Sequence, residues 1–237
     1  MSATLSITRR ELGAYFNTPI GYVFIIFFLV LTCYLYVQQL FVSNMADMRG
    51  YFGNLTFMFL FFIPAISMRL WAEERKLGTL ELLMTMPIKT WQAVLGKFLA
   101  GMIVILIMLV LTLHLPIALA FMGNPDAGPI IGGYVGSLIL GMIYLSIGAF
   151  ASSVTSDQIV AFVIALSINF FFYMLGMLAL WVKDYNATLA NVIERFGVGP
   201  HFESIARGVI DTRDIIYAVT VSGLFLLLNI LIVERRR

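Results

Sequence analysis

The residues able to do chemistry are few and widely separated in this sequence. Its two histidines, His114 and His201, do not form the His-Glu-x-x-His pattern of a zinc protease, and no nucleophile motif surrounds its serines. The loop that cradles nucleotide phosphates, Gly-x-x-x-x-Gly-Lys-Ser/Thr, does not occur. The single cysteine, Cys33, can form no internal disulfide. We expect a protein that is not an enzyme, that holds no metal or cofactor of its own, and that leaves any ATP chemistry to another polypeptide.

Ionisable side chains are nearly absent from the long apolar runs. Within a membrane such groups usually mark a proton or ion path, so a carrier driven by protons or sodium is expected to bury carboxylates. The runs hold essentially only His114. We interpret His114 as a hydrogen-bonded packing residue in preference to a substrate contact. The scarcity of buried charge argues against a secondary carrier or channel, which stays open as an alternative.

One charged stretch, residues 71–91, interrupts the apolar runs and is called the elbow below. It reads WAEERKLGTLELLMTMPIKTW, in which a Glu-Glu-Arg-Lys run is followed shortly by a glycine. The pattern predicts that Thr79 caps a short helix beginning at Leu80, and that Pro87 ends this helix.

The short helix in the elbow would have one apolar face. Leu80, Leu83 and Met84 fall at positions i, i+3 and i+4, which lie on the same side of a helix. A helix of about two turns is marginal in water unless another surface packs against it. The elbow therefore predicts a docking partner, and the alternative is a solvated loop held by lipid headgroups.

The composition is that of an integral membrane protein. The chain has 237 residues, of which 61% are hydrophobic and 12% charged, and its mean hydropathy is +0.96. Soluble domains are about 45–50% apolar and about 25% charged. The apolar blocks are long enough to cross about 30 Å of hydrocarbon as helices, and none alternates like a membrane β-barrel. The predicted fold class is all-α polytopic, with six spans over about residues 20–41, 51–70, 98–121, 130–152, 158–182 and 215–233.

Two features of the sequence describe how these spans begin and pack. Thr8 and Glu11 form a Thr-x-x-Glu capping pattern within residues 1–19, which predicts a short interfacial helix before the first span. The fourth span is rich in small residues, and pairs such as Gly132 and Gly136 let helix backbones approach closely. Helix packing is the preferred interpretation of those pairs, ahead of a ligand contact.

The longest segment outside the spans runs from residue 183 to residue 213. Its apolar spacing predicts two short amphipathic helices separated by residues 197–200. Two interpretations stay open, a gate for a substrate on the outer face and a cap on the bundle. The candidate gate residues are Phe196, Phe202 and Ile205.

The distribution of basic residues predicts the orientation. With six spans both termini share a face, and that face, which also carries the elbow, has about twice as many lysines and arginines as the opposite one. Because basic residues concentrate on the cytoplasmic side, we expect both termini and the elbow in the cytoplasm.

The elbow from Glu73 to Leu83, with Pro87, resembles the cytoplasmic signature of ABC-2 type transporter permeases. The likeness extends over nearly the whole chain, and it implies that residues 1–237 form one permease domain. The segment from His201 to Asp214 is similar to the gliding-motility-associated branch of that family. The matching elbow positions are Glu73, Glu74, Gly78, Thr79, Glu81 and Pro87, and the matching positions of the interfacial helix are Arg9, Arg10 and Glu11.

The resemblance implies a permease subunit of an ATP-binding cassette exporter in a bacterial inner membrane. Such a chain would pair with a second copy or a paralogue and with two ATPase subunits, which bind ATP and Mg. The elbow would be the coupling helix that docks on the ATPase, and the loop with Ser156 and Asp157 would also approach it. Membrane lipids and an extracytoplasmic auxiliary protein are further expected partners, and nucleic acid is not. A non-conducting membrane anchor is a second alternative, beside the secondary carrier or channel.

Overall fold

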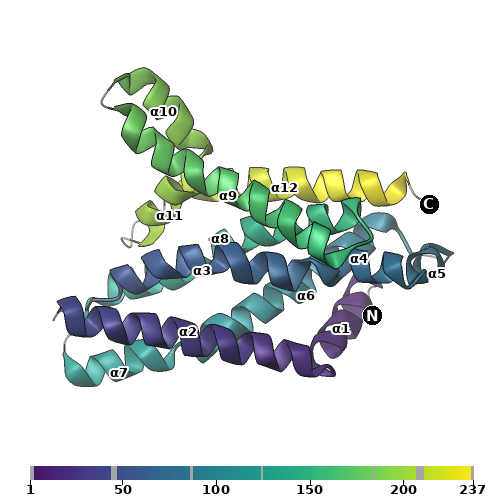
Figure 1. Cartoon of the computed structure of the whole chain (residues 1–237), viewed down its shortest axis with the longest axis horizontal. Coiled ribbons are helices and arrows are strands. Elements are labelled where there is room, and N and C mark those ends of the chain that lie inside the picture. Colours follow the sequence, from purple (N-terminus) through teal and green to yellow (C-terminus); the bar gives the residue numbers. More distant parts are fainter. Residues whose placement is uncertain are drawn as a thin grey trace.

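The computed structural model describes residues 3–43, 47–85, 88–123, 125–183, 185–206 and 211–235 (Figure 1). Within these ranges the chain is helical and forms no strand. The helices are α1 (Ala3–Phe16), α2 (Pro19–Ser43), α3 (Arg49–Ser67), α4 (Arg69–Lys76), α5 (Thr79–Thr85), α6 (Thr90–Leu111), α7 (His114–Met122), α8 (Ala127–Val154), α9 (Gln158–Lys183), α10 (Ala187–Phe196), α11 (Val198–Ala206) and α12 (Thr212–Glu234).

Six helical segments of the described chain are long and apolar enough to cross a membrane. They are α2, α3 with α4, α6 with α7, α8, α9 and α12. The predicted all-α polytopic fold is thus confirmed. Both termini lie at one end of the bundle, beside α1, α4 and α5, and we call this the terminal end (Figure 1). The opposite, distal end carries α7, α10 and α11.

Helix α8 is the centre of the bundle, because it packs against α3, α6, α9, α11 and α12. Its glycines make this possible. A Cβ atom on Gly133 would overlap the ring of Phe52, and one on Gly148 would overlap the side chain of Ser67. A Cβ atom on Gly141 would lie 3.1 Å from the side chain of Ile105. The small residues of the fourth span therefore permit close helix packing, as predicted.

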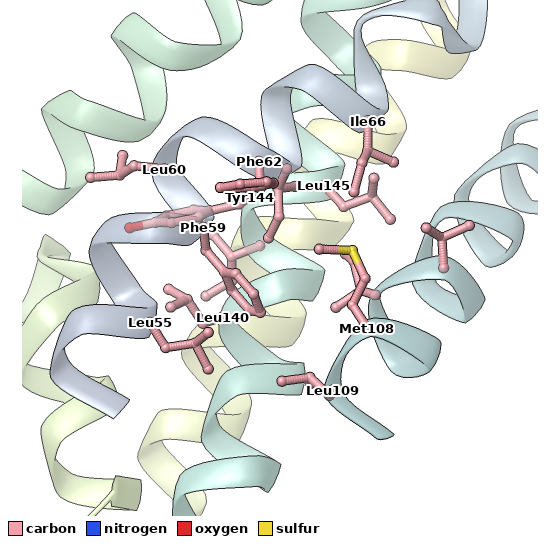
Figure 2. Close-up of a cluster of buried hydrophobic side chains, with 14 of the residues drawn as sticks. Leu55, Phe59, Leu60, Phe62, Ile66, Met108, Leu109, Leu140, Tyr144 and Leu145 are labelled. Carbon is pink, nitrogen blue, oxygen red and sulfur yellow. The ribbon is translucent and has the colours of Figure 1, made fainter. Parts of the chain in front are cut away.

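Apolar side chains of α3, α6 and α8 meet in the middle of the bundle (Figure 2). Phe59 and Ile63 of α3 are fully buried, as are Tyr144 and Leu145 of α8. Met108 enters the same cluster from α6 with 1% exposure. This core holds the second, third and fourth spans together, whereas α2, α9 and α12 keep much of their apolar surface on the outside.

The second span continues further than the sequence suggested. We expected it to end near Leu70, but α3 is followed after Met68 by α4, which continues to Lys76. Pro64 lies four residues before this single-residue break, and its carbonyl oxygen accepts the Met68 N–H at 2.9 Å. Proline cannot donate a backbone hydrogen bond and its ring crowds the preceding turn, so Pro64 favours a bend within α3 and does not account for the break at Met68. The charge run of the elbow is therefore helical and continuous with the span.

The interfacial helix is present, but its predicted cap is wrong. Helix α1 begins at Ala3, so Thr8 lies inside it and not at its start. The Thr8 hydroxyl lies 3.0 Å from the carbonyl oxygens of Thr4 and Gly96. A Cβ atom on Gly96 would lie 2.9 Å from the side chain of Ile7. The hydroxyl is thus used to pack α1 against α6, since Gly96 allows the two helices to touch.

The distal segment forms two short helices, as predicted, with a different boundary. Only Gly197 separates α10 from α11, and Pro200 lies in the first turn of α11, where its missing N–H needs no partner. Helix α10 folds back along the end of α9 (Figure 1). At this crossing a Cβ atom on Gly197 would lie 2.6 Å from the backbone nitrogen of Gly176. The two glycines let the backbones touch, which the pattern of apolar residues could not reveal.

Candidate functional site

Four charged side chains from three helices meet at the terminal end and form what we call the charge cluster. The Nζ atom of Lys97 in α6 lies 3.0 Å from Oε1 of Glu11 in α1 and 3.1 Å from Oε1 of Glu74 in α4. The guanidinium of Arg10 lies 2.6 Å from the same Glu74 oxygen and 3.0 Å from Glu11 Oε1. Two positive and two negative groups balance, so the cluster joins α1, α4 and α6 without a net charge.

The charge cluster is buried at its centre and exposed at its edge. The Lys97 side chain is 1% exposed and its Nζ lies 4.9 Å from the centroid of the Trp71 ring, whereas the Arg10 side chain is 51% exposed. Burial alone would raise the pKa of the Glu11 carboxyl, but Lys97 and Arg10 outweigh burial and hold that pKa below its ordinary value of 4.5. The carboxylate is therefore charged at neutral pH, and the cluster is ionic.

The sequence did not predict that Lys97 is buried. The third span was expected to start near residue 98, which would leave this lysine in the headgroups, but α6 begins at Thr90. Asp214, expected before the sixth span, is likewise inside α12 and 5% exposed. The expectation that His114 is the one ionisable group of the spans is corrected accordingly. His114 itself is hydrogen-bonded, with Nδ1 2.7 Å from the Leu111 carbonyl oxygen and Nε2 3.4 Å from Cys33 Sγ.

Helix α8 holds the beginning of α4 through a serine that the sequence did not single out. The Ser152 hydroxyl oxygen accepts the N–H groups of Trp71 and Ala72 at 3.0 and 3.1 Å, and it donates to the Met68 carbonyl at 2.7 Å. The first N–H groups of a helix lack partners within it, so Ser152 acts as a cap from another helix. Ser156 and Asp157, which the resemblance placed near the ATPase, are exposed at the same end, and Asp157 caps α9.

The end of α4 is also tied to α8. Arg75 donates to the carbonyl oxygen of Ser153 at 2.7 Å, and Glu73 pairs with Arg69 at 2.8 Å across one turn of α4. Glu74 reaches the charge cluster in the opposite direction. Two residues of the charge run, Glu74 and Arg75, thus engage neighbouring helices, and α4 is a fixed part of the bundle.

A glycine hinge separates α4 from α5. Gly78 has a φ of +70°, a conformation that residues with a Cβ atom rarely adopt, and no atom of the described residues lies within 4 Å of where its Cβ would be. The predicted cap is wrong here too, because α5 begins at Thr79 itself and the Thr79 hydroxyl donates to the Glu74 carbonyl at 3.2 Å. The last carbonyls of α4 lack helical partners, so this hydroxyl closes the end of α4 instead of starting α5.

Helix α5 lies at the extreme terminal end, beyond the bundle (Figure 1). Glu81, in its first turn, is exposed, and Leu77 before it is 68% exposed. Leu80 is half-buried and packs against the core. The side chains of Leu83 and Met84, and Pro87 as a whole, lie outside the described residues, so the apolar face and the end of this helix stay predictions.

The structure brings together two of the three candidate gate residues, and it buries both of them. Phe202 and Ile205 are buried, and both lie within 3.4 Å of where a Cβ atom on Gly136 of α8 would be. Phe196 is 60% exposed, and its carbonyl oxygen accepts the Tyr217 hydroxyl at 2.7 Å. The first two therefore anchor α11 to the bundle, and Phe196 alone presents a ring to the surroundings.

These features define a helical membrane protein whose terminal end carries a held helix, a glycine hinge and a projecting helix. Among the described residues, no group of three His, Cys, Asp or Glu side chains could hold a metal ion. The family model for ABC-2 family transporter proteins matches residues 20–232. The chain belongs to this family, and it is therefore a transmembrane subunit of an ABC transporter. No curated protein matches the chain.

Proposed function

We propose that this chain is the permease subunit of an ATP-driven exporter and that the elbow receives motion from a separate ATPase. The arrangement of α4 and α5 carries this proposal. Ion pairs and hydrogen bonds fix α4 to α1, α6 and α8, whereas α5 follows a glycine hinge and projects from the bundle. A force applied to α5 would reach α4 and, through it, three helices at once.

The coupling residues divide into two groups with different work. Glu74 fixes α4 to its neighbours, and Glu73 pairs with Arg69 within α4. Gly78 and Thr79 shape the turn. Leu80, Glu81, Leu83, Met84 and Pro87 would contact the ATPase. Glu81 stands in the first turn of α5, where a negative charge is favourable beside the positive end of the helix dipole. Packed helices move between discrete arrangements, so α4 would transmit closure of the ATPase dimer as a rigid step.

The surrounding assembly follows the family pattern. Two ATPase subunits would bind ATP and Mg, and a second copy of this chain or a paralogue would complete the transport pathway. The excess of basic residues at the terminal end supports an inner-membrane orientation with both termini cytoplasmic. The buried Phe202 and Ile205 favour a cap role for α11, which leaves Phe196 as the remaining gate candidate. The segment from residue 201 to 214 supports the assignment of this chain to the gliding-motility-associated branch. An auxiliary protein outside the membrane would be a further partner.

Photocrosslinking from the elbow tests the proposal. With benzoylphenylalanine at Glu81, which is exposed on α5, we expect a crosslink to a protein that carries an ATP-binding cassette, identified by mass spectrometry. The matched control places the same group at Thr188, exposed on α10 at the distal end, and should give no such product. Equal products from both positions, or no ATPase at either, would contradict the docking model.

A labelling experiment fixes the side of the membrane independently. Replacing Cys33 by serine removes the only native thiol, so Glu81→Cys then gives a single reporter. An impermeant maleimide should label this thiol in inside-out vesicles and not in intact cells. Labelling in intact cells would place the elbow outside and favour the alternatives, a secondary carrier or channel. ATPase activity that no substrate stimulates in the reconstituted complex would instead favour a non-conducting anchor.

A further inference from the structure

Three cavities follow one another from the terminal end into the membrane-facing surface of the bundle. The polar chamber, 460 Å³, is lined by the charge cluster, Arg69 and Glu73. The middle cavity, 180 Å³, shares Tyr15, Arg69 and Glu73 with the polar chamber. The apolar groove, 370 Å³, shares Phe24, Ala65 and Met68 with the middle cavity. The three therefore adjoin through common walls and follow one another from charged to apolar surroundings.

The apolar groove runs beside the terminal halves of three candidate spans. It is bounded by α2, α3 and α9, and its lining is almost entirely aromatic and aliphatic, with Phe27, Phe61 and Phe162 among its walls. From Met68 to Phe61 along α3 is about 10 Å at 1.5 Å per residue. One leaflet contributes about 15 Å of hydrocarbon, so the groove is long enough to take a large part of one lipid chain.

The wall between the polar chamber and the middle cavity is built from fixed polar groups. Arg69 pairs with Glu73 at 2.8 Å, and its guanidinium carbon lies 5.4 Å from the centroid of the Tyr15 ring. The Tyr15 hydroxyl donates to the carbonyl oxygen of Ile66. A polar boundary at the start of an apolar groove is the arrangement that an amphiphile requires, with its head on one side and its tail on the other.

We propose that these cavities bind a single-chain amphiphile with a zwitterionic head, taken from the leaflet on the terminal side. The middle cavity is too small for a helix of a second copy, which is about 10 Å across, but it admits one hydrocarbon chain. The idea that the amphiphile is also the transported substrate rests on the proposed function. The binding of the amphiphile is argued from the cavities alone and does not depend on that function.

The charges of the polar chamber select the head. Arg10, Arg69 and Lys97 are matched by Glu11, Glu73 and Glu74, and each lies in a described ion pair, so an anionic head finds no uncompensated cation. A zwitterionic head carries an ammonium beside its phosphate, so it can approach the carboxylates and the cations that line the chamber together, without adding a net charge.

Native mass spectrometry of the purified full chain, with any subunits that co-purify, tests the proposal. The probes are palmitoyl lysophosphatidylethanolamine, which is zwitterionic, and palmitoyl lysophosphatidylglycerol, which is anionic. We expect the zwitterionic probe to be retained about fivefold more than the anionic one, the ratio that one ion pair near a surface can supply. Equal retention of the two would overturn the choice of head.

One pair of variants tests where the probes bind. Ala65→Phe fills the wall common to the middle cavity and the groove and should reduce retention of both probes about tenfold, the cost of excluding about two methylene groups. Ala118→Phe makes the same change on the exposed face of α7 and should leave retention unchanged. Equal retention by the two variants would overturn the site. So would a change in subunit stoichiometry with Ala65→Phe, which would assign the groove to a second copy.

Changing the charges of the polar chamber should alter which of the two probes is preferred, a readout that a folding defect does not reverse. Glu73→Gln leaves Arg69 unpaired and should shift the preference about fivefold toward the anionic probe, whereas Arg69→Gln leaves Glu73 unpaired and should shift it the opposite way. Preferences that do not move would overturn the role of the polar chamber. The Glu81 crosslink is independent of these measurements, so failure of amphiphile binding and failure of ATPase docking are distinguished.

Discussion

Removing the positive charge of Lys97 tests the charge cluster most directly. In Lys97→Met the aliphatic bulk remains but the ammonium is lost, and Glu11 and Glu74 face each other with side chains only 13% and 15% exposed. Arg10 is then their remaining partner, and it is half-exposed. Removing one member of a buried ion pair costs about 3–5 kcal/mol, because the charges left behind are desolvated and unpaired. We expect the variant to be strongly destabilised.

The measurement compares thermal unfolding of purified variants in one detergent. The matched control is Arg49→Met, whose pair with Asp47 is long, at 3.8 Å, and well exposed on both sides. Exposed pairs of this kind contribute about 0–1 kcal/mol, so its midpoint should move little. A lowering in Lys97→Met no greater than in Arg49→Met would refute the reasoning.

The remaining predictions concern the helix contacts at both ends. The pKa of Glu11 lies below 4.5, so the stability that its charge contributes at neutral pH should be lost as the pH falls through this depressed pKa. In Glu11→Gln the unfolding midpoint should therefore fall less steeply with acid than in the unchanged protein. Ser152→Ala leaves two N–H groups of α4 without their acceptor and should cost about 1–3 kcal/mol in unfolding measurements, whereas Ser156→Ala, at an exposed position, should cost little. Gly176→Leu should push α9 away from the segment that joins α10 to α11, and it should raise the protease sensitivity of these two helices. An unchanged digestion pattern would count against the close crossing.

The parts of the fold that follow from composition were predictable, and those that depend on one helix meeting another were not. Six apolar runs fix six spans because each must satisfy its own backbone in the membrane. Thr8 and Thr79 have the local patterns of helix caps, yet their hydroxyls bond to carbonyls of Gly96 and Glu74. Capping rules describe a helix in isolation, and a neighbouring carbonyl competes for the same hydroxyl.

The candidate site was predictable in its residue types and not in its partners. The elbow was identified by its charges, and the turn at Gly78 follows from the freedom of glycine to adopt a positive φ. Nothing local indicates that Lys97 meets Glu11, 86 residues away, or that Ser152 caps a helix 81 residues before it. These contacts exist only because α1, α6 and α8 are brought to one end of the bundle.

The placement of an ionic cluster at this junction has a physical consequence beyond stability. Apolar contacts between helices have no directional bonds, whereas the bonds of Lys97 to both Glu11 and Glu74 favour this alignment of α1, α4 and α6. Replacing all three by Met and Gln would remove the buried charges and leave only Arg10, which is half-exposed and can be solvated, so much of the stability lost in Lys97→Met should return. The alignment would then depend on packing alone. If such a variant is stable but no longer couples ATP hydrolysis to transport, the cluster acts by positioning α4. If it is stable and fully coupled, the cluster is a structural contact, and the coupling role falls to the Ser152 and Arg75 contacts with α8.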